Sequence, residues 1–217
     1  MKLSAICDVQ SGYTARTRLN PTSKGGVPAV QLRDLQGEDD FDPAEASQYA
    51  LGPSFERYWA GAGDVLFRSR GERNTAVSVA PDSKGAAVAI LPLIVLRPDP
   101  SLADGRYIAW YINQRPAQLH FDKYARGTRL RMIPKGCLDS LEVPLPDLAT
   151  QQRIVEVDAL AKREDALMID LAQKKKLFTS FVLLEQVRKA QPHGNGAGQS
   201  AARQIKNPAG KSKRTNL

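Results

Sequence analysis

The sequence is poor in the residues that most often carry catalysis or bind metals. Its 217 residues include two cysteines and two histidines. Cys7 and Cys137 lie far apart and form neither a metal-binding nor a redox pair, so we expect two inert core thiols in a reducing compartment. His193 falls in a segment expected to be disordered, which leaves His120 alone for any histidine-dependent triad or metal cluster. We therefore expect no metal and no cofactor.

Several catalytic motifs are also missing. The sequence contains no phosphate-cradling G-x-x-x-x-G-K-[ST], no dinucleotide fingerprint, no H-E-x-x-H and no methyltransferase run of Asp or Asn followed by Pro-Pro and an aromatic residue. The remaining catalytic candidate is a nuclease-like set of Asp64, Asp82 and Lys84, which could hold Mg²⁺ and orient water. Asp82 and Lys84 lie in PDSKG, which is ordinary turn chemistry, and Asp64 follows Gly63 where aspartate commonly caps. A non-catalytic protein is the favoured interpretation.

No apolar run is long enough to cross a membrane. The longest, AAVAILPLIVL at residues 86–96, is shorter than the roughly 20 residues that a membrane helix needs and contains Pro92. We predict that it forms a buried strand. The N-terminal residues lack the succession of charged, apolar and small residues of a secretory signal, so we expect a cytoplasmic protein without a membrane anchor.

The charge favours a polyanionic partner. The net charge is +8 and the isoelectric point is about 9.6, which indicates nucleic acid or an acidic membrane rather than an acidic protein. Five of the basic residues and no acidic one follow position 190, so the body of the protein is only mildly basic. Residues 191–217 are rich in glycine and polar residues, and we expect a disordered basic tail.

The chain before the tail has two parts of different composition. Within residues 1–148, the β-favouring runs VPAVQL, DVLFRS, AVSVA, AVAILPLIVL and LEVPL alternate with turn clusters. Asp104 can cap a helix in GRYIAWYINQ, and Pro116 can then open a second short turn. Residues 150–189 contain no glycine or proline and many helix formers. We predict an α+β domain followed by a long helix.

The predicted helix carries an apolar stripe whose positions step by three and four residues. Glu164 and Lys174 occupy two intervening places, so the stripe resembles an imperfect coiled-coil seam. The alternative is a helix packed only on its own domain, but a helix this long would then leave leucine and phenylalanine exposed. We expect a dimer or partner interface at Val157, Leu160, Leu167, Leu171, Phe178 and Phe181.

The stretch YARGTRLRMIPK, residues 124–135, concentrates positive charge. If the chain is extended from Thr128, Arg129 and Arg131 share one face with Ile133. Together with Arg126 they need anions, and the stretch that follows offers no carboxylate before Asp139. The expected ligand is a phosphate backbone or a guanine edge.

Three other segments supply candidate DNA contacts. In LFRSRG two arginines share a face of the predicted strand, and Glu72 is an alternative ion-pair partner for them. The segment QLRDLQ offers a glutamine that can pair with adenine and an arginine that can pair with guanine. The segment GYTARTRLN is a polar loop with two arginines. Ordinary solvated side chains are the alternative in each case. Tyr107, Trp110 and Tyr111 are expected in the core rather than stacked on bases. The additional candidates are Arg16, Arg18, Gln31, Arg33, Arg68 and Arg70.

The order of these features resembles the specificity subunits of type I restriction-modification systems. The resemblance lies in GDVLFRSRG, YIAWYIN, G-T-x-x-x-x-I at 127–133, L-x-x-L-x-V-P-L-P at 138–146 and Q-x-x-I at 151–154, and it covers residues 1–189. It implies a target recognition domain at 1–148 that reads half of a split double-stranded DNA site. It also implies a spacer helix at 150–189 that pairs antiparallel with its counterpart and docks methyltransferase subunits.

Two departures from the family pattern matter. Members usually carry two recognition domains and two spacer helices, whereas this sequence has one of each, and Thr150 stands where the family tends to place glutamate. The resemblance thus implies a non-catalytic half-subunit that works with a modification subunit and a restriction subunit. A homodimer would recognise an interrupted palindrome, and pairing with a second half-length chain is the rival. A Mg²⁺-dependent nuclease and a protein-binding coiled-coil adaptor remain the alternative functions.

Overall fold

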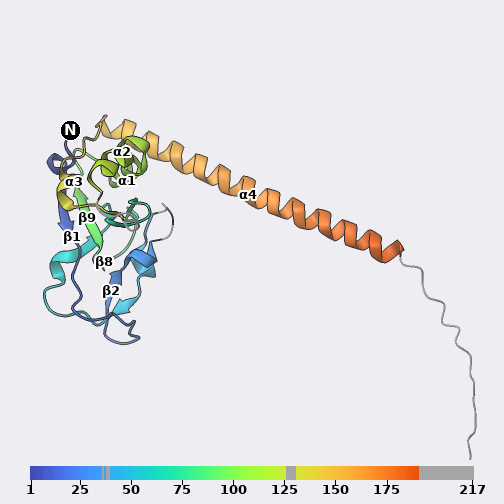
Figure 1. Ribbon diagram of the computed structural model, residues 1–217, viewed down its shortest axis with the longest axis horizontal. Helices are drawn as coiled ribbons and strands as arrows, with labels where there is room; N and C mark the ends of the chain where they lie inside the picture. Colours follow the sequence, from blue (N-terminus) through green and yellow to red (C-terminus); the bar gives the residue numbers. More distant parts are fainter. Residues whose placement is uncertain (36, 38–39, 126–130, 191–217) are drawn as a thin grey trace, which may run out of the picture. The chain divides into compact units, whose positions relative to one another are not determined.

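The computed structural model of the protein describes residues 1–35, 37, 40–125 and 131–190 (Figure 1). The chain divides into two compact units, Met1–Glu164 and Asp165–Leu217. The first unit combines short strands with helices, and a long helix completes the described chain. The α+β class predicted from the sequence is confirmed. The predicted tail at 191–217 lies outside the described residues.

One antiparallel sheet forms the centre of the first unit. Its four strands run in the order β1-β9-β5-β7. Phe67 of β5 contributes to the cluster beneath the helices, whereas Leu66 contributes to the cluster shared with the second sheet. Both faces of the sheet are therefore buried, as the apolar run in DVLFRS indicates. The strands are β1 (Cys7–Ser11), β5 (Val65–Arg68), β7 (Ala76–Ser78) and β9 (Leu93–Pro98).

A second four-stranded sheet has the order β3-β2-β8-β4, in which β2 and β8 are parallel and the other pairs antiparallel. The single strand predicted at residues 86–96 is wrong. The run forms β8 in this sheet and β9 in the first, and Leu91 and Pro92 connect them. The members of the sheet are β2 (Val27–Val30), β3 (Gln48–Tyr49), β4 (Trp59–Gly61) and β8 (Ala86–Ala89).

The strand predicted at LEVPL is also wrong. This segment makes only an isolated bridge between Glu142 and Lys2, because Pro144 and Pro146 lack the N–H groups that a continued ladder requires. Backbone hydrogen bonds from Leu3 to Leu141 and from Val143 to Met1 still fix the segment beside the N-terminus.

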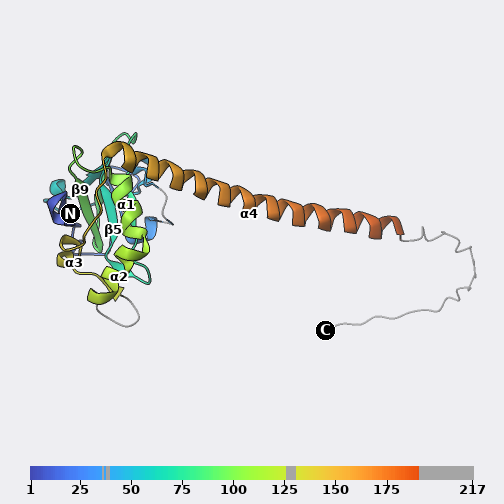
Figure 2. The ribbon, with the colours of Figure 1, turned by 90° about the horizontal axis from the view of Figure 1, so that it is seen from above.

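The helix predicted in GRYIAWYINQ is confirmed, and the short turn expected at Pro116 is instead a helix of ten residues. The carboxylate of Asp104 accepts the Arg106 N–H at 2.8 Å and caps α1 (Gly105–Asn113), and Pro116 lies in the first turn of α2 (Arg115–Tyr124). Figure 2 shows α1 against the sheet that contains β5 and β9. Tyr107 is buried and donates its hydroxyl to the Pro144 carbonyl at 2.7 Å, so it belongs to the core. The shorter elements are α3 (Lys135–Asp139), η1 (Leu3–Ala5), η2 (Leu32–Asp34), η3 (Pro43–Glu45), η4 (Glu56–Tyr58), β6 (Arg70–Gly71) and β10 (Arg131–Met132).

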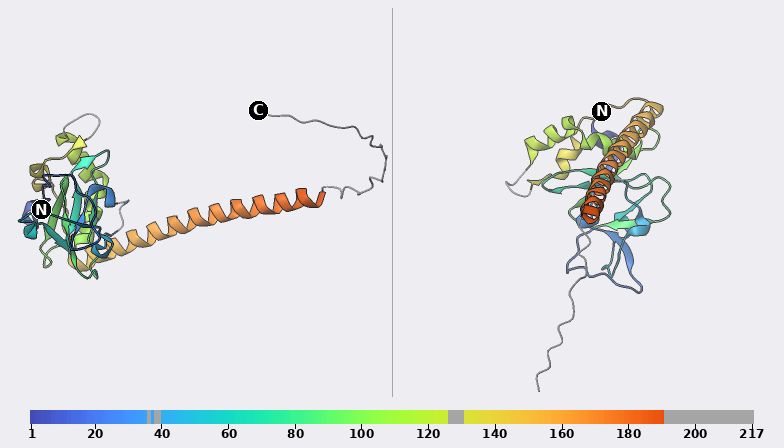
Figure 3. Two further views of the ribbon diagram at one scale, coloured as in Figure 1. Left: turned by 90° about the horizontal axis from the view of Figure 1, so that it is seen from below. Right: turned by 90° about the vertical axis from the view of Figure 1, so that its right-hand side faces the viewer.

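The long helix predicted at 150–189 is confirmed as α4 (Leu148–Ala190), which Figure 3 shows as one unbroken helix. Asp147 caps its start by accepting the Thr150 N–H at 2.9 Å. Within the first unit, Gln151 is fully buried, and Ile154 and Val155 pack against the core. The apolar residues from Leu167 to Val187 are exposed. No helix in the described ranges is long and apolar enough to cross a membrane.

The two cysteines are free and buried, as the sequence predicts. Burial raises the pKa of Cys7 to about 12 and that of Cys137 to about 11, because the thiolate loses its hydration. Both thiols are therefore protonated and unreactive at neutral pH.

Candidate nucleic-acid interface

The fold brings together two arginine-rich segments that are far apart in the sequence. Strands β6 and β10 form an antiparallel two-stranded sheet in which Arg70 faces Met132 and Gly71 faces Arg131. The Ile133 N–H extends the pairing by donating to the Ser69 carbonyl at 2.8 Å. The extended conformation predicted around Arg131 is thus observed at residues 131–132. Arg126 and Arg129 lie outside the described residues.

A surface groove beside β6 gathers arginines from two segments. Its volume is about 420 Å³, and among the described residues of its lining there are four arginines and one acidic residue, Glu72. The residues of this arginine groove are Leu32, Arg33, Leu35, Arg68, Arg70, Gly71, Glu72 and Arg73. The fold therefore concentrates positive charge on a body that is only mildly basic overall, as an anion-binding surface requires.

The arginines of the groove differ in how firmly they are held. Arg33 lies in η2 and donates to the Tyr49 hydroxyl at 3.0 Å, a hydrogen bond that raises the pKa of the guanidinium. Arg70 and Arg73 are exposed, and neither guanidinium makes a hydrogen bond or an ion pair within the described part of the chain. The alternative pairing of Arg70 with Glu72 is not formed there. Arg70 and Arg73 can therefore turn toward an anion without breaking an existing contact.

Residue Arg131 has a partner that sequence reasoning missed. Its guanidinium forms an ion pair with Asp122 of α2. Asp122 precedes the arginine stretch in the sequence, whereas the search for a carboxylate considered the residues that follow it. The ion pair reduces the positive charge that Arg131 presents and fixes the direction of its side chain.

The N-terminal candidates lie in a different place. Arg16 lines a pocket of about 500 Å³ with Tyr13 and Tyr58, whose rings meet edge to face at 5.5 Å. Arg18 is exposed, and it lines neither this pocket nor the arginine groove. Gln31 precedes η2, and its backbone N–H donates to the Asp34 carboxylate at 2.8 Å. Among the described candidates, Arg16 thus lines one pocket and Arg33, Arg68 and Arg70 line another, whereas Arg18, Gln31 and Arg131 line neither.

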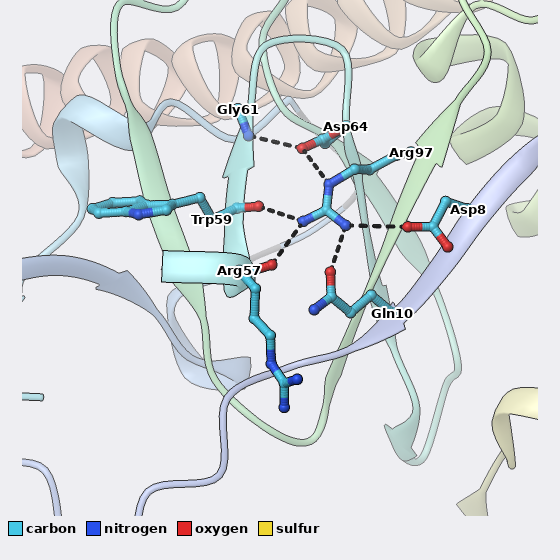
Figure 4. Close-up of polar contacts among 7 residues, drawn as sticks. All are labelled: Asp8, Gln10, Arg57, Trp59, Gly61, Asp64 and Arg97. Atoms are coloured by element: carbon cyan, nitrogen blue, oxygen red, sulfur yellow. Dashed lines mark hydrogen bonds and ion pairs between the residues drawn. The ribbon is translucent and has the colours of Figure 1, made fainter. Parts of the chain in front are cut away.

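Asp64, the central residue of the nuclease alternative, belongs to a structural network (Figure 4). Its carboxylate accepts the Gly61 N–H at 2.9 Å and lies 3.8 Å from Nε of Arg97. Burial raises the pKa of Asp64, and the charge of Arg97 opposes the rise. Asp82 is an exposed turn residue. Across the ranges that the structure describes, no group of three or more His, Cys, Asp or Glu residues could hold a metal ion.

Arg97 links the two sheets and was not singled out by sequence reasoning. From β9 it donates to Oε1 of Gln10 at 2.6 Å and to the carbonyl of Trp59 in β4 at 2.8 Å. It also reaches the Arg57 carbonyl at 3.3 Å and the Asp8 carboxylate at 3.6 Å. An arginine at the end of an apolar strand is the only sequence signal for this role. Arg73 was also missed, because only its position in the lining of the arginine groove distinguishes it from other exposed arginines.

Comparison with solved structures identifies the fold. No protein-family model and no curated protein matches the chain. A chain from a structure of complex assembly and conformational transition of the type I R-M system matches with a TM-score of 0.58 and 20% identity, over 83% of this chain and 42% of that chain. The HsdS subunit from Thermoanaerobacter tengcongensis matches with a TM-score of 0.54 and 21% identity, over 77% and 38% of the two chains.

A third similar structure is the type I restriction-modification system S subunit from M. genitalium, with a TM-score of 0.50, 12% identity and coverage of 75% of this chain and 38% of that chain. The chain therefore has the fold of type I restriction-modification S subunits, as its motifs indicate, and it spans 38% to 42% of the chains it matches.

Proposed function

We propose that the protein is a non-catalytic DNA-recognition subunit of a type I restriction-modification complex. Residues 1–148 act as the target recognition domain and bind one half of a split site in double-stranded DNA. Residues 150–189 pair with a second subunit and carry the methyltransferase and restriction subunits. The observation that carries the proposal is the arginine groove on a domain with the S-subunit fold.

The arginine groove suits the phosphate backbone of duplex DNA because one of its arginines is held by a hydrogen bond, whereas two others are able to reorient toward a phosphate. Arg33 is held by Tyr49, whereas Arg70 and Arg73 are exposed and uncommitted in the described structure. Guanidinium groups bind phosphate oxygens in pairs of hydrogen bonds and can also meet O6 and N7 of guanine. Contacts of the first kind position the domain, and contacts of the second kind read the sequence. Arg16, Arg18, Gln31, Arg68 and Arg131 are proposed as further contacts on the same domain, with Arg126 and Arg129.

A homodimer is the proposed assembly, since a single recognition domain reads only half of a site. Two copies related by a two-fold axis would present identical domains and recognise an interrupted palindrome. The apolar residues proposed for pairing, Val157, Leu160, Leu167, Leu171, Phe178 and Phe181, are all exposed in the single chain and support a helix that acquires a partner.

The test is the salt dependence of binding to duplex DNA, measured with the chain bound to its methyltransferase subunit. Arg70→Ala and Arg73→Ala should each weaken binding and reduce the slope of log affinity against log salt by about 1, because each removes one phosphate contact. Arg115→Ala is the matched control, since Arg115 is exposed on α2 and outside the groove. Unchanged affinity and slope in both groove variants would contradict the proposal, and a complex with no affinity for DNA would favour the adaptor alternative.

A further inference from the structure

The helix α4 carries a seam of exposed apolar side chains that continues over most of its length. Leu160, Leu167, Leu171, Phe178 and Phe181 are between 48% and 69% exposed, although burial in an apolar environment stabilises leucine and phenylalanine side chains. Val157 extends the seam toward the start of the helix. The positions follow the a and d places of a heptad repeat, in which a second helix covers the seam.

Charged residues interrupt this seam at two places. Lys174 takes a d place between Leu167 and Phe181, and Glu164 takes an a place between Val157 and Leu171. The apolar seam of one helix does not by itself explain why these two places carry charged residues. The two have opposite charges, however, and they lie at equal distances along the chain on either side of Ile169.

That symmetry points to the occupant of the seam. Resting on the proposed pairing of α4, we infer that α4 pairs antiparallel with α4 of a second copy of this chain, in the register that places Lys174 opposite Glu164 of the second copy. In an antiparallel pair, a places face d places, so the two-fold axis passes at the level of Ile169. The Lys174–Glu164 contact then forms twice, once on each side of the axis.

The same register pairs the rest of the seam without further adjustment. Leu167 faces Leu171 of the second copy, Leu160 faces Phe178, and Val157 faces Phe181. Glu185, the next charged residue of the seam, falls opposite Arg153 of the second copy, which is exposed. Every charged place in the seam thus meets an opposite charge, and every apolar place meets an apolar side chain.

Asp170 is the residue that this register brings close to its own counterpart, because it flanks the seam near the axis. Its carboxylate already lies 2.7 Å from Nζ of Lys174 in the same helix. Lys174 therefore neutralises Asp170 within one copy and faces Glu164 of the other. The cluster near the axis alternates in sign, which limits the repulsion between the two aspartates.

Parallel pairing of two copies gives the opposite result. In a parallel dimer in register, a places face a places and d places face d places, so Glu164 would meet Glu164 and Lys174 would meet Lys174. Like charges at a pairing surface act against the wrong partner or orientation. A different chain as the partner would not require the charges of this helix to complement one another about its own Ile169. Self-complementarity therefore favours a second copy of this chain.

Sedimentation equilibrium of the full chain tests the register. Glu164→Lys and Lys174→Glu should each raise the dimer dissociation constant roughly tenfold or more, because each replaces two attractive contacts with two repulsive ones. The double variant Glu164→Lys/Lys174→Glu should restore the dissociation constant to within about threefold of wild type. Lys176→Glu is the matched control, since it makes the same change of charge outside the seam, and circular dichroism should show equal helix content in all variants.

The outcomes distinguish three hypotheses: the antiparallel register, pairing through α4, and DNA recognition. A wild-type dimer that the single changes leave intact, or that the double change fails to restore, overturns the antiparallel register while pairing through α4 stands. A wild-type chain that stays monomeric at all accessible concentrations overturns pairing with a second copy. Neither result bears on the arginine groove, whose test is the salt dependence of DNA binding.

Discussion

The buried amide of Gln151 makes a sharp test of how α4 begins. The side chain is fully buried in the first turn of the helix. Its Oε1 accepts the Asp104 N–H at 2.9 Å, and its Nε2 donates to the carbonyls of Leu102 at 3.0 Å and Pro146 at 2.8 Å. One side chain thus joins the start of α4 to the loop before α1 and to the segment before α4 itself.

Replacing Gln151 with alanine removes all three hydrogen bonds and leaves buried groups without partners. Each hydrogen bond contributes about 0.5–1.5 kcal/mol net, so the loss should be about 1.5–4.5 kcal/mol before any cost of the cavity. The deleted side-chain atoms add to this loss as far as the site fails to collapse. We expect a decrease of about 3 kcal/mol in the free energy of unfolding, a large share of the roughly 5–15 kcal/mol of a typical domain.

Urea unfolding of the full chain measures the loss. Both tryptophans, Trp59 and Trp110, lie in the first unit and report its unfolding by fluorescence. Gln152→Ala is the matched control, because the neighbouring glutamine has the same chemistry and is exposed. The reasoning is refuted if Gln151→Ala costs less than about 1 kcal/mol or no more than the control.

Two further predictions concern Arg97 near the end of β9 and Asp147 at the start of α4. Arg97→Met should lower the free energy of unfolding by about 2–3 kcal/mol in urea titrations at neutral pH, because Gln10, Trp59 and Asp64 lose their shared partner. The difference in free energy of unfolding between Arg97→Met and wild type should shrink as the pH falls through the raised pKa of Asp64, since the protonated carboxyl no longer needs a cation. A difference that grows in acid would contradict the role of Arg97 as a partner of Asp64. Hydrogen bonds from Thr150 lower the pKa of Asp147 in the folded protein. Its contribution is therefore complete above the ordinary carboxyl range and is lost as the pH falls through the lowered pKa, so Asp147→Ala should reduce stability at pH 7 and flatten the acid limb of a pH–stability curve. Identical acid limbs in the two proteins would argue against the cap.

Local signals in the sequence were sufficient for the helices α1 and α4 and for the strands β2, β5 and β7. Asp104 as a cap and the absence of glycine and proline after residue 150 each predict the element observed. The run at 86–96 shows why sheet membership was harder. Burial on both faces makes β8 and β9 equally apolar, and nothing local assigns them to different sheets.

Long-range contacts account for what the sequence could not predict at the candidate interface. The motif around Arg70 and the motif around Arg131 were both identified, but their pairing depends on β6 meeting β10. Asp122 was overlooked because it precedes the arginine stretch and reaches Arg131 only through the fold. Gln151 was noticed as part of a motif, and its three buried hydrogen bonds supply the physical reason for the glutamine.

Methylation mapping of genomic DNA tests the central claim most directly. Cells should express the chain together with the methyltransferase and restriction subunits proposed as its partners, with cells lacking the chain as the control. The account predicts methylation at a two-part site whose halves are inverted copies of each other. Methylation at two unrelated half-sites would contradict the homodimer, and a methylation pattern that does not depend on the chain would contradict its role in DNA recognition.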